Sequence, residues 1–249
     1  MNEAPIWWKR PRRVTVVVDN PSWILPYAER LVAEFCASGD HAVLLQRYLD
    51  VPEGAVAFYL GCIKIAPPEV VARNKRNLVV HESDLPRGRG FSPLSWQILN
   101  GESEIAVCLL EAVAEVDAGP VIYRDRVEFA GHELIDDMRD TIGDITMRLC
   151  RRFLAEPTPV AGEAQKGTPT VFARRRPTDS RLDPEKSIVD QFELLRIVDN
   201  NKYPAWFDYR GHRYRIRIDK VESERGSSCQ VSRMPCQLPT SLPLLSRGI

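Results

Sequence analysis

The sequence has 249 residues, 44% of them hydrophobic, which is enough for one main domain and a smaller extension. Its 34 basic and 34 acidic residues give a formal net charge of +0, so we predict no nucleic-acid partner, despite short basic runs at 9–13 and 174–176. No run reaches the roughly 18 apolar residues of a membrane span, and the first residues show no signal-peptide pattern. We therefore predict a cytoplasmic protein without a membrane partner.

The cysteines lie far apart and form no C-x-x-C pair. This spacing disfavours a zinc site and a disulfide scaffold, so we predict no metal and a reducing compartment. The cysteines are Cys36, Cys62, Cys108, Cys150, Cys229 and Cys236.

Short apolar runs alternate with helical patterns through the first half of the chain. This alternation is typical of an α/β fold, in which crossover helices join the strands of a mainly parallel sheet. The predicted strands are 14–19, 41–45, 55–61, 77–81, 105–113 and 120–129, and the predicted helices are 24–38, a short one from Pro67, 93–99 and 134–154.

The second half changes in composition after the long helix. The predicted parts are a catalytic domain at 1–156, a Pro- and Gly-rich linker at 157–178, a small C-terminal unit at 179–221 and a mobile tail at 222–249. Within the small unit we predict a helix at 184–198 and a β-hairpin whose strands, 206–209 and 212–218, flank Arg210-Gly211.

His81 stands at the carboxyl end of the predicted strand 77–81, and Asp117 lies between two later strands. Ligands of open α/β sheets collect at the carboxyl ends of strands, and neighbouring strand ends would bring these two residues together. A carboxylate beside an imidazole fixes its tautomer and favours its protonated form, which suits proton donation or oxyanion stabilisation in acyl transfer. The alternative is that both are ordinary surface residues of two loops.

The stretch 77–119 resembles the signature region of the folate-dependent formyltransferases, which include methionyl-tRNA, glycinamide-ribonucleotide and nucleotide-sugar N-formyltransferases. The shared features are the histidine, an L-P-x-x-x-G loop at 85–90, a helix ending in L-N-G-E at 99–102 and a V-D-x-G corner at 116–119. With the segment that begins at Leu60, the likeness covers roughly residues 55–125.

This resemblance implies a Rossmann-like formyltransferase core that moves a formyl group from N10-formyltetrahydrofolate to an amine. His81 and Asp117 match the family's catalytic histidine and aspartate, whereas Val79 stands where the family has an asparagine. Loss of one oxyanion donor typically costs about 10²–10³ in rate. Ser83 is therefore a candidate replacement donor. The folate-binding residues implied by the resemblance are Leu85, Pro86, Gly90, Leu110, Val113 and Val116.

The stretch 179–218 resembles the C-terminal part of nucleotide-sugar N-formyltransferases, most of all those of the pseudaminic-acid type. It implies a nucleotide-linked amino sugar as acceptor, for example a UDP-4-amino-4,6-dideoxy-hexose, and a homodimer with the hairpin as its contact. The substrate-binding residues would be Arg196, Asn200, Tyr203 and Trp206, although the two aromatic residues could equally anchor the hairpin.

Two alternatives stay open. The first is a non-catalytic relative that binds folate or a nucleotide sugar, motivated by Val79. The second is transfer to another amine, such as methionyl-tRNA. Methionyl-tRNA formyltransferases carry an additional basic barrel domain, for which the residues after 155 are too few and whose positive charge this chain lacks. We therefore expect an acceptor other than tRNA.

Overall fold

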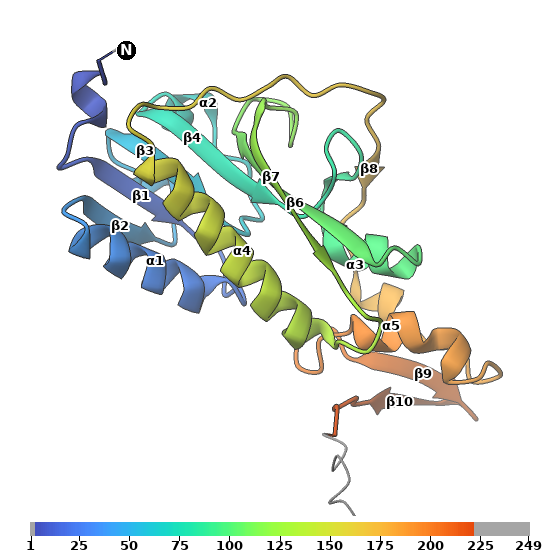
Figure 1. Ribbon diagram of the computed structural model, residues 1–249. Helices are drawn as coiled ribbons and strands as arrows, with labels where there is room; N and C mark the ends of the chain where they lie inside the picture. Colours follow the sequence, from blue (N-terminus) through green and yellow to red (C-terminus); the bar gives the residue numbers. More distant parts are fainter. Residues whose placement is uncertain (1–2, 222–249) are drawn as a thin grey trace, which may run out of the picture. The chain divides into compact units, whose positions relative to one another are not determined.

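The computed structural model describes residues 3–221 (Figure 1). The predicted tail at 222–249, with Cys229 and Cys236, lies outside the described residues. Within the described part, no helix combines the length and the apolar character that a membrane span requires.

A six-stranded sheet forms the centre of the fold, with strand order β2-β1-β3-β4-β6-β7. Its strands are β1 (Arg13–Val17), β2 (His41–Leu45), β3 (Gly54–Tyr59), β4 (Asn74–His81), β6 (Glu104–Glu111) and β7 (Val121–Glu128). The β1–β2, β1–β3 and β3–β4 pairs are parallel, whereas β4–β6 and β6–β7 are antiparallel. The predicted α/β fold with a mainly parallel sheet is confirmed.

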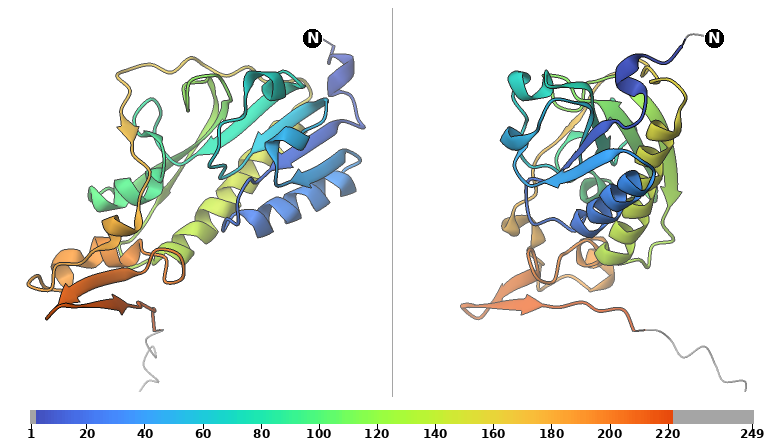
Figure 2. Two further views of the ribbon diagram at one scale, coloured as in Figure 1. Left: turned by 180° about the vertical axis from the view of Figure 1, so that it is seen from behind. Right: turned by 90° about the vertical axis from the view of Figure 1, so that its left-hand side faces the viewer.

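Two amphipathic helices, α1 (Leu25–Ala37) and α4 (Ile135–Ala155), lie side by side on one face of the sheet (Figure 1, Figure 2). Their buried residues recur every three or four positions and join the sheet in one apolar cluster. The opposite face carries a smaller cluster that includes Val70 of the short helix α2 (Pro68–Val71). The helix α3 (Pro93–Leu99) follows the loop after β4.

The segment predicted as a linker, 157–178, packs against the core. Glu163 and Val121 exchange two backbone hydrogen bonds of 2.8 Å each. Further along, the two-residue strand β8 (Val171–Phe172) pairs in parallel with β5 (Arg89–Gly90). These contacts tie the segment to the loop that follows His81.

The hairpin of the C-terminal unit consists of β9 (Ala205–Tyr209) and β10 (His212–Ile216), close to the predicted strands. The helix predicted at 184–198 is wrong in length, because only a 3₁₀ turn at Val189–Gln191 and α5 (Phe192–Arg196) are helical. The Gln191 side chain accepts the Asp183 N–H at 2.7 Å and donates to the Asp183 carbonyl at 3.1 Å. Such side-chain bonds to backbone hold the first half of the predicted helix as a loop.

Candidate active site

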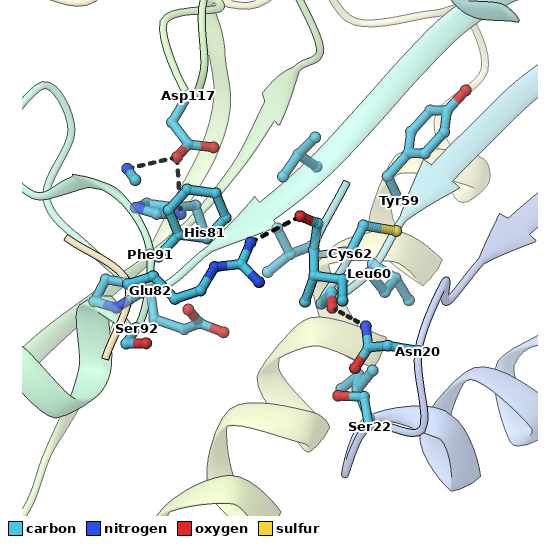
Figure 3. Close-up of a pocket in the computed structure, with 18 of the residues that line it drawn as sticks. Asn20, Ser22, Tyr59, Leu60, Cys62, His81, Glu82, Phe91, Ser92 and Asp117 are labelled. Carbon is cyan, nitrogen blue, oxygen red and sulfur yellow. Dashed lines mark hydrogen bonds and ion pairs between the residues drawn. The ribbon is translucent and has the colours of Figure 1, made fainter. Parts of the chain in front are cut away.

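A cavity of about 640 Å³ opens at the carboxyl ends of β1, β3 and β4 (Figure 3). This volume lies in the range of small-molecule pockets, and the position is where α/β sheets bind ligands. Its walls come from the loops that follow these strands, from the loop after β6, and from two later segments of the chain. The segments that contribute are 20–24, 59–66, 79–82, 90–95, 110–117, 174–176 and 199–203.

His81 ends β4 and is 5% exposed. Its Nε2 lies 2.7 Å from the Gly88 carbonyl oxygen. Because a carbonyl oxygen can only accept, Nε2 carries a hydrogen. The other ring nitrogen, Nδ1, lies 3.5 Å from Oδ2 of Asp117. The structure thus brings the predicted histidine and aspartate together at the wall of the cavity.

The route by which Asp117 reaches His81 differs from the prediction. Since β6 runs antiparallel to β4, its last residue, Glu111, pairs with Leu78 and not with the end of β4. The loop 112–119 therefore folds back, and Asp117 adopts a left-handed conformation with φ of 52°. Its Oδ2 accepts the Gly90 N–H at 2.8 Å, which fixes the carboxylate beside the imidazole.

Glu82, the residue directly after His81, was not predicted as a site residue. Its carboxyl group points into the cavity (Figure 3), and among residues 3–221 it has no ion-pair partner. Its carbonyl oxygen accepts the Nε2–H of Gln97 at 2.6 Å, so α3 holds the backbone at this point. Burial raises the pKa of the Glu82 carboxyl. Its place just past a strand end was the only sequence signal.

Comparisons with known proteins agree with this geometry. Residues 30–152 match the formyl transferase family. Over this region the chain is similar to the formyl transferases. A methionyl-tRNA formyltransferase of Dinoroseobacter shibae is 28% identical over 154 residues, which make up 61% of this chain and 51% of that protein. This chain thus spans about half the length of that curated relative.

Solved structures show the same fold at low identity. A likely sugar N-formyltransferase from Mycobacterium tuberculosis has a TM-score of 0.66 and 16% identity, covering 83% of this chain and 97% of its own. HypX from Aquifex aeolicus, solved in complex with tetrahydrofolic acid, has a TM-score of 0.64 and 16% identity, covering 82% and 37%. The predicted resemblance to the formyl transferase family is confirmed over residues 30–152, and the solved structures confirm the fold.

The residues predicted to bind folate fall into two groups in the structure. Four of them line the cavity: Gly90, Leu110, Val113 and Val116. Leu85 is buried beneath the loop in a cluster with Leu110, and the Pro86 carbonyl accepts the Thr170 N–H at 3.3 Å. These two residues support the loop and do not line the cavity.

The position of the family asparagine is apolar here. Val79 lines the cavity and offers no hydrogen-bond donor. Asn77 cannot substitute, because its side-chain N–H groups donate to the Val71 and Asn74 carbonyls at 2.8 and 3.1 Å. The Ser83 hydroxyl is buried without a hydrogen-bond partner among the described residues, but Ser83 does not line the cavity.

Of the four residues predicted to bind the acceptor, only Tyr203 lines the cavity. Arg196 is buried and forms an ion pair with Glu133 at 3.0 Å. Asn200 bonds the backbone of Ile218 through both ends of its amide. The Trp206 indole donates to the Pro177 carbonyl at 2.8 Å. The guanidinium of Arg213 lies 3.7 Å from the centroid of its ring. Arg196 thus ties the C-terminal unit to the loop before α4, whereas Asn200 and Trp206 bond backbone groups at 218 and 177.

Five cations line the cavity, four of them on the two later segments and one, Lys64, on the loop after β3. Within residues 3–221, these cations have no carboxylate at ion-pair distance. They are Lys64, Arg174, Arg175, Arg176 and Lys202. Arg174 donates to the Ile63 carbonyl at 2.8 Å. Arg175 donates to the Asp179 carbonyl at 3.0 Å, its Nε is buried without a partner, and burial lowers its pKa. The run of three arginines at 174–176 is evident in the sequence, but the sequence does not show that it lies at the cavity.

Proposed function

We propose that this chain is an N-formyltransferase that moves the formyl group of N10-formyltetrahydrofolate to the amino group of a nucleotide-linked amino sugar, as in the pseudaminic-type branch. The observation that carries the proposal is the His81–Asp117 pair on the wall of a ligand-sized cavity, inside the region that matches the family. The homodimer and the cytoplasmic location stay predictions.

The apolar side of the cavity suits a folate. Leu110, Val113 and Val116 offer a hydrocarbon wall, and the strand and loop backbone offers polar groups at its edge. HypX, which shares this fold over 37% of its length, was solved in complex with tetrahydrofolic acid, and this supports a folate as the donor. Bound here, the folate would supply the formyl group on N10.

The chain's own groups would then act on that formyl group. The formyl oxygen gains negative charge when the amine attacks, and the polar ring of His81 beside the cavity could stabilise that charge electrostatically. Asp117 fixes the orientation of the His81 ring, while the Gly90 N–H holds Asp117 in place. The pair is thereby ready before the substrate binds.

The cations that line the cavity support a phosphate-bearing acceptor. Arg175 and Lys202 line the cavity together with Tyr203, which is 44% exposed and could stack on a nucleobase. A partly buried guanidinium without a counter-ion is costly, and a phosphate oxygen would supply the missing charge and acceptor. Because the identity with a methionyl-tRNA formyltransferase is 28%, an aminoacyl-tRNA is the second candidate acceptor.

A product assay tests the function directly. Purified protein is incubated with N10-formyltetrahydrofolate and a panel of UDP- and dTDP-linked 4-amino-4,6-dideoxy sugars, with methionyl-tRNA and glycinamide ribonucleotide as further acceptors. Chromatography and mass spectrometry should show the gain of one formyl group on a nucleotide sugar. Formylation of methionyl-tRNA alone would move the function to the second candidate. Folate binding without any product would favour the non-catalytic relative.

Arg175→Gln is expected to raise the KM for the nucleotide sugar about tenfold, because a hydrogen bond to a charged group contributes about 1.5–3 kcal/mol. The kcat should change little, since Arg175 would bind a part of the acceptor remote from the reacting amine. Arg213→Gln, on the exposed hairpin, is the control and should leave both constants unchanged. An unchanged KM in Arg175→Gln would show that Arg175 does not contact a phosphate of the acceptor.

Val79→Asn is expected to leave kcat at or below the wild-type value. If the enzyme is active with valine, its oxyanion already has other donors, and an asparagine would only disturb the packing against Tyr59 and Leu110, the register partners of Val79. Steady-state kinetics decide the point. A rise of about 10²-fold would mark the position as a lost catalytic donor and favour the non-catalytic relative.

A further inference from the structure

The loop after His81 places an unassigned carboxyl group in the cavity. We propose that Glu82 binds the ammonium group of the acceptor and removes one proton from it before the amine attacks the formyl carbon. This inference rests on the proposed function and adds to it the group that generates the nucleophile.

Formyl transfer to an amine requires such a group. A primary amine is largely protonated near neutral pH, and the nitrogen can attack only when it has an unshared electron pair. Both ring nitrogens of His81 and one carboxylate oxygen of Asp117 already have partners within the protein. His81 points Nε2–H at the Gly88 carbonyl and faces Asp117 with Nδ1, while Asp117 Oδ2 accepts the Gly90 N–H.

Glu82 has the placement that a proton acceptor needs. It follows His81 directly, and its carboxyl group faces the cavity without a cation at ion-pair distance among residues 3–221 (Figure 3). Its backbone is held by Gln97, which is itself 5% exposed and also donates to the Pro93 carbonyl at 3.0 Å. A side chain on such a fixed backbone is oriented before the substrate arrives.

The electrostatic surroundings favour a carboxyl group that takes up a proton readily. Burial is the main cause that raises the pKa of Glu82; a charge on His81 lowers it, and the charge of Asp117 raises it further. Two other cavity carboxylates, Glu111 and Asp199, are neutralised by Arg76 and Arg139. The remaining charged groups around the cavity are Lys64, Arg174, Arg175, Arg176 and Lys202, none of which forms an ion pair with Glu82.

The proton step and the transfer balance as follows. One N–H bond of the ammonium breaks, its electron pair stays on nitrogen, and the proton forms an O–H bond with the Glu82 carboxylate. That electron pair then bonds the formyl carbon, while the bond between this carbon and N10 breaks and its pair returns to N10. A second proton, lost from the attacking nitrogen, completes the N10–H group. Glu82 afterwards releases its proton to water.

Glu82→Gln tests this assignment, with Glu102→Gln as the matched control in an exposed turn after α3. We expect Glu82→Gln to lower kcat at least about 100-fold, in the range of general-base contributions, and Glu102→Gln to leave it unchanged. The affinity for the nucleotide amino sugar, measured by calorimetry with tetrahydrofolate in place of the formyl donor, should also fall. An unchanged kcat and affinity would overturn the proposal.

The stability of the two variants separates a catalytic from a structural role. A carboxyl group whose pKa is raised in the folded state contributes stability below its unfolded pKa, and this is lost as pH rises through the folded value. The amide introduced by Glu82→Gln would mimic the neutral carboxyl, so at an alkaline pH this variant should unfold at the same temperature as the wild type or a higher one. The difference should vanish towards about pH 4.3. A lower unfolding temperature would assign a structural role and overturn the inference.

The pH profile gives the last readout. In the wild type, kcat/KM should fall as pH drops through the raised pKa of Glu82, because the base becomes protonated. This acidic limb should be absent in Glu82→Gln, and a limb that persists there would count against the proposal. Failure of the proposed function is a different result, namely a wild-type protein that forms no formylated product with any acceptor. The affinity and unfolding measurements do not depend on turnover.

Discussion

Replacement of His81 by alanine is expected to lower kcat for formyl transfer by about 10³-fold, within the range that one general acid or base contributes. The imidazole lies at the end of β4, with one nitrogen on the Gly88 carbonyl and the other facing Asp117. Alanine removes the group that would stabilise the formyl oxygen. The affinity for folate should change little, because the apolar wall of the cavity stays in place.

Single-turnover kinetics with the nucleotide sugar would measure the chemical step, and fluorescence titration with tetrahydrofolate would measure the affinity. His212→Ala, in the exposed first residue of β10, is the control and should behave like the wild type. A His81→Ala variant that retains kcat would remove His81 from the mechanism. A variant that loses both kcat and folate affinity would point to a collapsed loop instead.

The regular elements of the core could be predicted because their sequence periods are long and consistent. The helix predicted at 134–154 is α4 at Ile135–Ala155, and the strand predicted at 41–45 is β2. The apolar residues of α4 recur at a helical period that a strand could not bury, whereas 41–45 is a short apolar run of the length typical of a strand. The two-residue strands β5 and β8 could not be predicted, since two residues carry no period and their pairing joins distant segments.

The candidate site was predictable only where a residue's place along one strand determines its role. His81 belongs to this class, because it ends a buried strand. Asp117 reaches it through a loop that reverses an antiparallel strand, which strand order alone does not reveal. The importance of Glu82 and Arg175 lies in what they lack within residues 3–221, namely a partner of opposite charge, and only tertiary structure shows this. Arg196, by contrast, forms an ion pair with Glu133 and does not line the cavity.

Replacement of Gly119 by alanine is expected to lower kcat about 100-fold and to destabilise the fold by about 1–3 kcal/mol. Added to Gly119, a Cβ would lie 1.8 Å from the Glu111 carbonyl oxygen, a backbone atom that cannot rotate away. The loop 112–119 must therefore shift. Asp117, two residues earlier, would move with it and lose its contacts with His81 and the Gly90 N–H.

Gly101→Ala is the matched control for this loop. Gly101 has φ of 81° and no atom within 4 Å of an added Cβ, so alanine there should cost stability through backbone strain without touching the site. Thermal unfolding and steady-state kinetics of both variants separate the two effects. A loss of kcat confined to Gly119→Ala would show that close packing of the loop against β6 positions the aspartate. An equal kcat in the two variants would mean that the position of Asp117 does not depend on the close packing at Gly119.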